Sequence, residues 1–285
     1  MVIAFCPGHI SGYFRRVEGA TLATTGSIGA GIVISEGVRS TVTPADVTSI
    51  EILQKTSKGT TRTIARESPI LSSVLDKLGV SVSVVTECRL PISAGFGLSA
   101  AALISTITAT NRLCNLGLST HEIALIAHEA EVTFRTGLGD VSACQGGGMV
   151  IRNGPGIDAE IERWHHFTEP LYAVTFGPIN TPTVLGSPEQ MARVASAFPQ
   201  VRPDNAATLF RLSREFTERS GLMTREVENV LRCCDENGIL SSMTMLGNGV
   251  FACGHHARDI LLPFGEVFEF RVAQNGACIL EGEIV

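Results

Sequence analysis

Short apolar runs and strict alternation mark the first ninety residues of the chain. Apolar runs at 2–6 and 32–34 are bounded by glycine or proline, and valines alternate with serines over 80–84. An alternation with a period of two is typical of a strand with one buried face. We therefore predict a β-rich N-terminal part, with its first strand ending at Pro7-Gly8.

The pattern becomes helical at residue 99. An Ala/Ile/Leu-rich stretch over 99–115 predicts a helix that ends near Gly117. Ser119, with Glu122 three residues later, forms a capping-box signature and predicts a second helix to about Phe134. A glycine-rich segment over 136–148 then leads into a strand-like stretch at 149–152.

The second half of the chain carries its own set of strands and helices. We predict strands at 171–176, within 241–253, and at 268–272 and 278–284, and helices starting at Ser187-Pro188 and spanning 205–219 and 224–236. Asn275-Gly276 predicts a hairpin between the last two strands. Polar and Gly/Pro-rich residues over 153–168 indicate a boundary. The fold class is therefore α+β, with domains at 1–160 and 161–285.

Composition narrows the class of partner. The 285 residues carry a net charge of −6, which argues against a nucleic-acid surface. No apolar run approaches about 20 residues, so we expect no membrane span. The eight cysteines form no C-x-x-C pair, a pattern typical of reduced thiols, and we expect a cytoplasmic protein.

The stretch Pro91–Ala101 carries the clearest chemical signal. A glycine-rich turn enters a helix there, and a helix N-terminus with its free N–H groups attracts anions. Gly95 and Gly97 allow the backbone to approach a phosphate closely, and Ser99 places a hydroxyl beside it. The chain has no G-x-x-x-x-G-K-[ST] motif. Gly95–Ala100 fits the loose G-x-G-x-x-A dinucleotide pattern, but a second helix follows where a parallel strand would be needed.

This stretch resembles the central ATP motif of the GHMP kinases, usually Pro-x-x-x-Gly-Leu-Gly-Ser-Ser-Ala-Ala. Phe96 and Leu98 depart from that pattern, whereas Ser99 keeps the second serine. Pro7-Gly8-His9 and the loop Leu246–Val250 resemble two further GHMP motifs. Within the superfamily, four segments are similar to the archaeal pantoate kinase family: 7–14, 25–31, 127–132 and 136–141.

The resemblance implies a two-domain GHMP-kinase fold, with an N-terminal domain like domain 2 of ribosomal protein S5 and a ferredoxin-like C-terminal domain. It also implies that ATP and Mg²⁺ are the cofactors. The residues implied to bind ATP are Pro91, Ser93, Ala94, Gly95, Phe96, Gly97, Leu98, Ser99, Ala100 and Ala101.

Asp140 resembles the superfamily's aspartate beside the acceptor hydroxyl, where a carboxylate accepts a proton or orients the nucleophile. The alternative is a cap of the turn after Gly139. Glu131 and Ser99 are the expected Mg²⁺ ligands, since Mg²⁺ prefers oxygen. Glu129 is the alternative metal ligand, although the i, i+3 spacing of His128 and Glu131 lets both face one cleft and so favours Glu131. The other alternative is that Glu131 is a solvated carboxylate on the helix surface.

Ser27, His128 and Arg152 are the expected substrate-binding residues, because a small hydroxy acid needs a cation and hydrogen-bond donors at its anionic end. The alternatives are a turn serine, a core histidine and a surface arginine. His9 stands where mevalonate-kinase-like members carry lysine. Without a lysine that lowers the pKa of the catalytic aspartate, Asp140 orients the acceptor hydroxyl and a neighbouring cation supplies the charge. The alternative is that His9 is a local turn residue, so the role of His9 is left unassigned.

The activity that the resemblance implies is transfer of the γ-phosphoryl group of ATP to the primary hydroxyl of (R)-pantoate, giving 4-phosphopantoate for coenzyme A biosynthesis. Three alternatives stay open: a kinase for homoserine, shikimate or mevalonate; a non-catalytic ATP-binding regulator; and a structural S5-like module, which leaves the second glycine loop unexplained. The expected partners are ATP and a small molecule, with no nucleic acid and no membrane. A homodimer is compatible with the resemblance, since many relatives dimerise.

Overall fold

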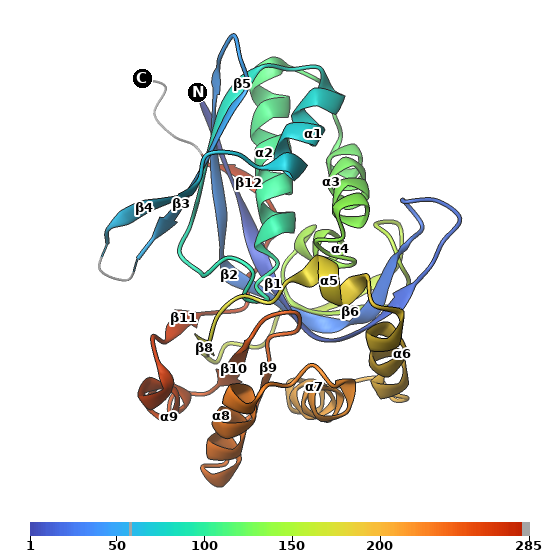
Figure 1. The fold of residues 1–285 in the computed structure, drawn as a ribbon, viewed down its shortest axis with the longest axis vertical. Helices are drawn as coiled ribbons and strands as arrows, with labels where there is room; N and C mark the ends of the chain where they lie inside the picture. Colours follow the sequence, from blue (N-terminus) through green and yellow to red (C-terminus); the bar gives the residue numbers. More distant parts are fainter. Residues whose placement is uncertain (57–58, 281–285) are drawn as a thin grey trace.

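A large sheet, antiparallel except for the parallel pair of β3 and β5, forms the upper part of the molecule with helices on one face (Figure 1). The computed structural model describes residues 1–56 and 59–280. The sheet has eight strands in the order β12-β1-β2-β5-β3-β4, with β6 paired to β2 and β7 to β6. Its strands are β1 (Val2–Val17), β2 (Gly26–Pro44), β3 (Ser49–Lys55), β4 (Thr61–Ala65), β5 (Val82–Cys88), β6 (Met149–Arg152), β7 (Ile161–Trp164) and β12 (Cys278–Leu280).

The first strand does not end at Pro7-Gly8, so that prediction is wrong. β1 continues to Val17 and pairs antiparallel with β2, with register shifts at Pro7/Gly8 and between Ser11 and Tyr13. An irregular register lets a strand bend without ending, which a proline in the sequence does not reveal. Next to the first shift, the backbone N–H of His9 donates to the carbonyl of Phe96, 2.9 Å away.

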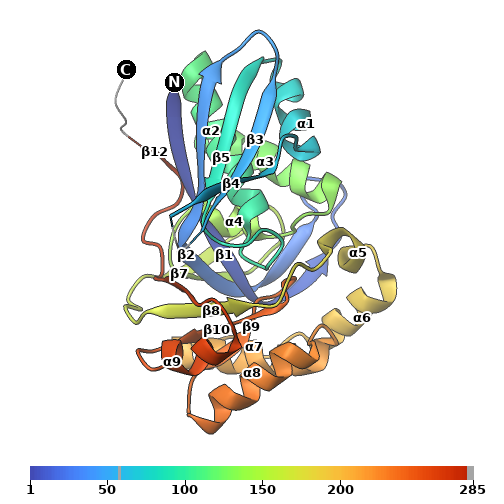
Figure 2. The ribbon, with the colours of Figure 1, turned by 60° about the vertical axis from the view of Figure 1, so that its left-hand side comes forward.

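Of the four helices beside this sheet, α2 and α4 pack against its strands, whereas α1 and α3 pack on α2. Figure 2 shows α1, α2 and α3 on one side of β5, β2 and β3. The four helices are α1 (Pro69–Leu78), α2 (Leu98–Cys114), α3 (Thr120–Phe134) and α4 (Asp140–Cys144). The predicted helices at 99–115 and 119–134 are confirmed, and the capping box at Ser119 and Glu122 is present in both directions. α1 and α4 were not expected from the sequence.

A second, four-stranded sheet and its helices form the lower part (Figures 1 and 2). Its strand order is β11-β8-β10-β9. The strands are β8 (Leu171–Thr175), β9 (Ser241–Met243), β10 (Gly249–Cys253) and β11 (Phe268–Phe270); the helices are α5 (Thr181–Leu185), α6 (Pro188–Ala197), α7 (Ala206–Ser220), α8 (Arg225–Glu236) and α9 (Ala257–Leu261). The three helices predicted here are confirmed, with Ser187, Asn205 and Thr224 as their N-caps.

The predicted C-terminal hairpin is wrong. β11 pairs with β8 in the second sheet, whereas β12 pairs with β1 in the first, so the two strands do not meet. Asn-Gly favours a tight turn locally, but the exposed edges of two different sheets supply the partners. Residues 281–284 of the predicted strand lie outside the described residues.

The mixed α+β class is confirmed by this arrangement of sheets and helices. The domain boundary at residue 160 stays a prediction. Two strands that follow this residue, β7 and β12, still join the first sheet. No helix in the described part of the chain combines the length and the apolar character that crossing a membrane requires.

Candidate active site

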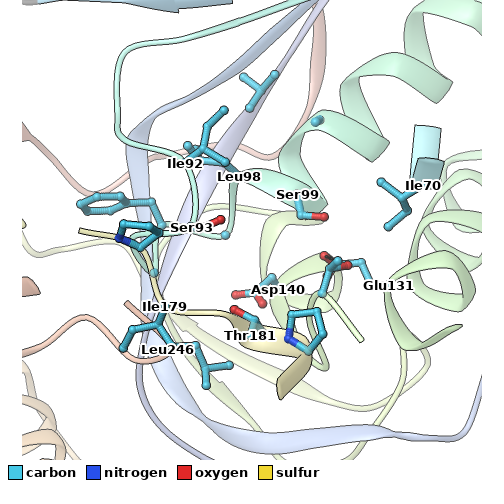
Figure 3. Close-up of a pocket in the computed structure, with 18 of the residues that line it drawn as sticks. Ile70, Ile92, Ser93, Leu98, Ser99, Glu131, Asp140, Ile179, Thr181 and Leu246 are labelled. Carbon is cyan, nitrogen blue, oxygen red and sulfur yellow. Dashed lines mark hydrogen bonds between the residues drawn. The ribbon is translucent and has the colours of Figure 1, made fainter. Parts of the chain in front are cut away.

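A cavity of about 640 Å³ lies where the two parts of the molecule meet. Figure 3 shows Ser99, Glu131, Asp140 and Thr181 with their oxygen atoms directed into the same space, and Ile92, Leu98, Ile70, Ile179 and Leu246 around it. One part of the wall is apolar, formed by Val38, Ile52, Ile70, Leu71, Ile92 and Ala102. The cavity therefore has room for an extended ligand with one apolar and one charged end.

Two glycine loops meet at the wall of this cavity. A Cβ on Gly95 would lie 2.8 Å from the carbonyl oxygen of Met245, so the loop after residue 90 touches the loop at 244–249 with its bare backbone. Gly95 and Gly97 have φ of 83° and 62°, a region that favours glycine. Gly97 is the N-cap of α2 and makes no side-chain cap, so the first amides of this 17-residue helix are left for an anion.

The residues expected to bind ATP divide into two groups. Ser93, Gly95, Phe96, Gly97, Leu98 and Ser99 line the cavity. The other four, Pro91, Ala94, Ala100 and Ala101, are absent from its wall, and the three alanines are buried in the core. The small side chains at the start of α2 thus serve close packing and bring its N-terminus to the cavity.

Asp140 begins α4 directly after Gly139, and its side chain is 20% exposed. Its Oδ1 accepts a hydrogen bond from Nδ1 of His9, 2.8 Å away. Burial alone raises the pKa of this carboxyl, but the hydrogen bond from His9 and the positive charge of Arg152 hold it below its ordinary value. Asp140 is therefore ionised at neutral pH.

Glu131 lies on α3 and is 1% exposed. Its Oε1 accepts from the hydroxyl of Thr136 at 3.2 Å, whereas Oε2 is buried without a partner. Burial and the charge of Asp140 raise the pKa of Glu131 to about 8, although Ser99 and Thr136 act as hydrogen-bond partners. Glu131 therefore holds its proton at neutral pH in this structure, and its unpartnered Oε2 offers a position for a cation once the group is ionised.

Glu129 is turned to a different neighbour. Its carboxylate forms an ion pair with Lys77 of α1 at 2.8 Å, and it is not part of the cavity wall. Within the described residues, no three His, Cys, Asp or Glu side chains group to hold a metal. Mg²⁺ commonly binds to one or two protein ligands and to the phosphates of a nucleotide, which Ser99 and Glu131 fit.

Ser27 and Arg152 lie side by side next to Asp140. The guanidinium of Arg152 donates to the carbonyl of Gly139 at 3.0 Å and to the hydroxyl of Ser27 at 3.4 Å. Ser27 lines the cavity, whereas Arg152 is 2% exposed and lies behind Ser27 and Gly139. Arg152 thus adds positive charge to this end through the residues in front of it.

His128 is placed differently from Ser27. Its Nε2 donates to the carbonyl of Thr25 at 2.8 Å, and the ring is buried and is not part of the cavity wall. Burial lowers its pKa, and the bond to Thr25 offsets this in part. In this structure His128 fixes the backbone two residues before Ser27.

Several residues of the wall were not expected from the sequence. They come from the second part of the chain and from β1 and the loop before α4: Phe14, Leu138, Pro178, Ile179, Asn180, Thr181, Pro182 and Met245. Leu246 belongs to the second glycine loop, and Phe14 and Leu138 lie in the segments 7–14 and 136–141 that resemble the pantoate kinase family, but none of the three was assigned to the site. The others meet through tertiary packing, which no local pattern encodes.

Comparison with known proteins extends this description. Residues 62–148 match the family model described as "GHMP kinases N terminal domain". The pantoate kinase of Methanospirillum hungatei is 48% identical over 282 residues, 99% of this chain and 97% of that protein. The pantoate kinase of Thermococcus kodakarensis is 29% identical, covering 88% of this chain and 87% of that protein.

A solved structure titled "Phosphotransferase related to CoA biosynthesis pathway" has the same fold. It superposes with a TM-score of 0.81 at 24% identity, covering 98% of each chain. The expected two-domain GHMP-kinase fold is confirmed by this likeness. With nearly half of its residues identical along almost its whole length to a pantoate kinase, the chain belongs to the pantoate kinase family of the GHMP kinases.

Proposed function

We propose that this protein transfers the γ-phosphoryl group of ATP to the primary hydroxyl of (R)-pantoate, giving 4-phosphopantoate and ADP. The observation that carries the proposal is the meeting of Ser99, Glu131 and Asp140 in one cavity, beneath the free N-terminus of α2. The 48% identity to a pantoate kinase supports the choice of acceptor. The activity itself is that of a phosphotransferase with an alcohol acceptor.

The nucleotide would lie along the cavity with its phosphates at the Gly95–Ser99 turn. The amides there offer donors and the positive end of the helix dipole. The apolar side chains of Ile52, Ile70 and Leu71 would contact the base.

Ser99 and Glu131 would hold Mg²⁺, because both line the cavity and the buried Oε2 of Glu131 has no hydrogen-bond partner. When bound, the ion neutralises charge on the phosphates during transfer. Loss of the proton that Glu131 holds at neutral pH accompanies binding, since the ligand is the carboxylate.

Asp140 would act on the acceptor hydroxyl. Its Oδ1 is occupied by His9, so Oδ2 is the oxygen left to accept a hydrogen bond from that hydroxyl. As an ionised group it orients the nucleophile and accepts the hydroxyl proton when the bond to phosphorus forms.

The acceptor end of the cavity matches a small branched hydroxy acid. Ser27 would donate to the carboxylate, with the buried charge of Arg152 directly behind it and His128 fixing the Ser27 segment. Phe14 and Leu138 supply apolar contacts for the two methyl groups of pantoate. Both ends of the acid are thereby fixed relative to Asp140.

An acceptor panel tests this function. The purified protein with ATP and Mg²⁺ is given (R)-pantoate, homoserine, shikimate or mevalonate, and ADP release and product mass are measured. We expect ADP and a singly phosphorylated product with (R)-pantoate in preference to the other three. Phosphorylation of homoserine with no reaction of pantoate contradicts the proposal.

A further inference from the structure

His9 touches both halves of the proposed catalytic machinery. Its backbone N–H donates to the carbonyl of Phe96 in the phosphate loop at 2.9 Å. Its ring Nδ1 donates to Oδ1 of Asp140 at 2.8 Å, across 131 residues of sequence. One residue of β1 therefore sets the distance between the loop expected to bind ATP and the carboxylate expected to meet the acceptor.

The ring of His9 has little freedom to move. It is fully buried, and a Cβ on Gly31 of β2 would lie 3.0 Å from its Cε1. A Cβ on Gly97 would lie 3.0 Å from the carbonyl oxygen of His9 and 3.3 Å from Oδ1 of Asp140. Two glycines thus make room for the ring and for its bond, which holds Asp140 in one orientation.

The surroundings favour an uncharged ring. Nε2 of His9 is buried and has no hydrogen-bond partner, so a proton there would be unsatisfied. Burial lowers the pKa of His9; the bond and charge of Asp140 oppose this, and the charges of Arg152 and Arg163 add to it. The neutral tautomer with its proton on Nδ1 satisfies the carboxylate, which can only accept.

We propose that His9 is a positioning residue which, as a neutral donor, fixes Asp140 against the phosphate loop and leaves Oδ2 free for the acceptor hydroxyl. This inference rests on the proposed function for the identity of the acceptor. This role differs from that of a cation beside the carboxylate. The positive charge near Asp140 comes from Arg152, whereas His9 fixes the orientation of the Asp140 side chain.

Three variants separate these roles. His9→Leu fills much of the ring volume without a donor. His9→Asn places an amide N–H close to the position of Nδ1, uncharged, and His9→Gln places its amide near the position of Nε2. All three are compared with wild type for kcat, for KM of pantoate and of ATP, and for the melting temperature.

We expect His9→Leu to lower kcat about 10- to 100-fold, the cost of losing a hydrogen bond to a charged group that positions the nucleophile. Both KM values should stay within about threefold, since His9 makes no contact that holds pantoate or ATP before the reaction. His9→Asn should recover most of kcat, and His9→Gln should resemble His9→Leu. A purely structural role would lower the melting temperature without this order of kcat values.

Two outcomes overturn the proposal. One is a His9→Leu protein that keeps kcat within about twofold of wild type; the other is a folded His9→Asn protein no faster than His9→Gln. If His9→Leu fails to fold, the Asn and Gln pair still decides, because both are uncharged amides.

A spectroscopic readout separates failure of this inference from failure of the proposed function. Nitrogen-15 NMR of the histidine rings at pH 7 needs no acceptor. We expect His9 to be neutral with its proton on Nδ1, and the signal to shift in Asp140→Asn. An imidazolium at His9 contradicts the inference even if pantoate is phosphorylated, and the neutral tautomer supports it even if another acceptor proves right.

Discussion

The two parts of the molecule differ in whether they bury acidic and basic side chains as well as hydroxyls. Up to residue 160, four acidic or basic side chains are at most 2% exposed, besides several buried hydroxyls: His9, His128, Glu131 and Arg152. Among the described residues after 160, the buried polar side chains are all hydroxyls: Ser213, Thr217, Ser220, Ser241, Ser242 and Thr244. Both parts bury a large apolar core, so the contrast is one of chemistry.

This contrast shows which part of the molecule carries the free-energy cost of burying groups that can take part in chemistry. Buried hydroxyls cost little when they are bonded, as when Ser213 and Thr217 donate to helix carbonyls at 2.7 and 2.9 Å. The hydroxyls of Ser241 and Thr244 are buried without a partner, but they carry no charge. Buried charges are costly unless paired, and Glu131 and Arg152 each keep an orphaned atom. The first part therefore holds the reactive groups, whereas the second supplies walls such as Ile179 and Leu246.

The largest effect should follow from Asp140→Asn, which removes the negative charge from the acceptor end. We expect kcat to fall about 10²- to 10⁴-fold, because a positioned base is lost. ATP binding, measured by calorimetry, should change little. Unchanged turnover would remove the role of Asp140.

Glu131→Gln should come next, with Glu129→Gln as its matched control two residues away on the same helix. We expect kcat/KM to fall about 100-fold and the Mg²⁺ requirement to rise for Glu131→Gln, because a metal ligand is lost. Glu129→Gln breaks only a surface ion pair with Lys77 and should stay within about twofold of wild type. The reverse order would assign the metal to Glu129.

The same pair of variants tests stability against pH in the absence of ATP and Mg²⁺. The pKa of Glu131 is about 8 in the folded protein and near its ordinary 4.5 when unfolded. Between these values only the folded state holds the proton, so the free energy of unfolding falls as pH rises. Glu131→Gln should therefore melt higher than wild type at pH 8 by on the order of 5 °C, and by less at pH 5. An equal difference at both pH values contradicts the shift.

A smaller effect is expected from Ser27→Ala at the substrate end. The loss of one donor to a carboxylate should raise KM for pantoate about 10-fold and leave KM for ATP unchanged. Steady-state kinetics with each substrate varied in turn measures this. A rise in KM for ATP alone would place Ser27 at the nucleotide instead.

The smallest effect on activity should come from the second part. The hydroxyl of Ser242 lies 3.1 Å from that of Thr217 in the buried interior of the second part, and neither residue lines the cavity. Ser242→Ala should cost about 1 kcal/mol of unfolding free energy, measured by denaturant titration, while kcat and both KM values stay at wild-type levels. A loss of activity without a loss of stability would erase the contrast between the two parts.

Local signals in the sequence predicted local structure well. The capping box at Ser119 and the glycine turn before Ser99 identified helices α3 and α2, because caps and positive φ are decided within a few residues. The hairpin at Asn275-Gly276 failed because the pairing of a strand depends on which sheet edge is free.

The candidate site could be predicted only in part. Motif resemblance pointed to Ser99, Glu131 and Asp140, which do line one cavity. The bond between His9 and Asp140 spans 131 residues and depends on how β1 crosses the start of α4, which no spacing in the sequence reveals. The Pro178–Pro182 wall likewise arises only when the two parts pack together.

The most direct test of the account is a phosphorus-31 NMR assay of the product formed from ATP, Mg²⁺ and (R)-pantoate. We expect one new phosphate-ester signal, coupled to the protons on C4 of pantoate, with one ADP formed for each ester. Asp140→Asn should form neither product at a comparable rate. ADP that accumulates with inorganic phosphate and no ester, or an ester formed equally fast by Asp140→Asn, would contradict this expectation.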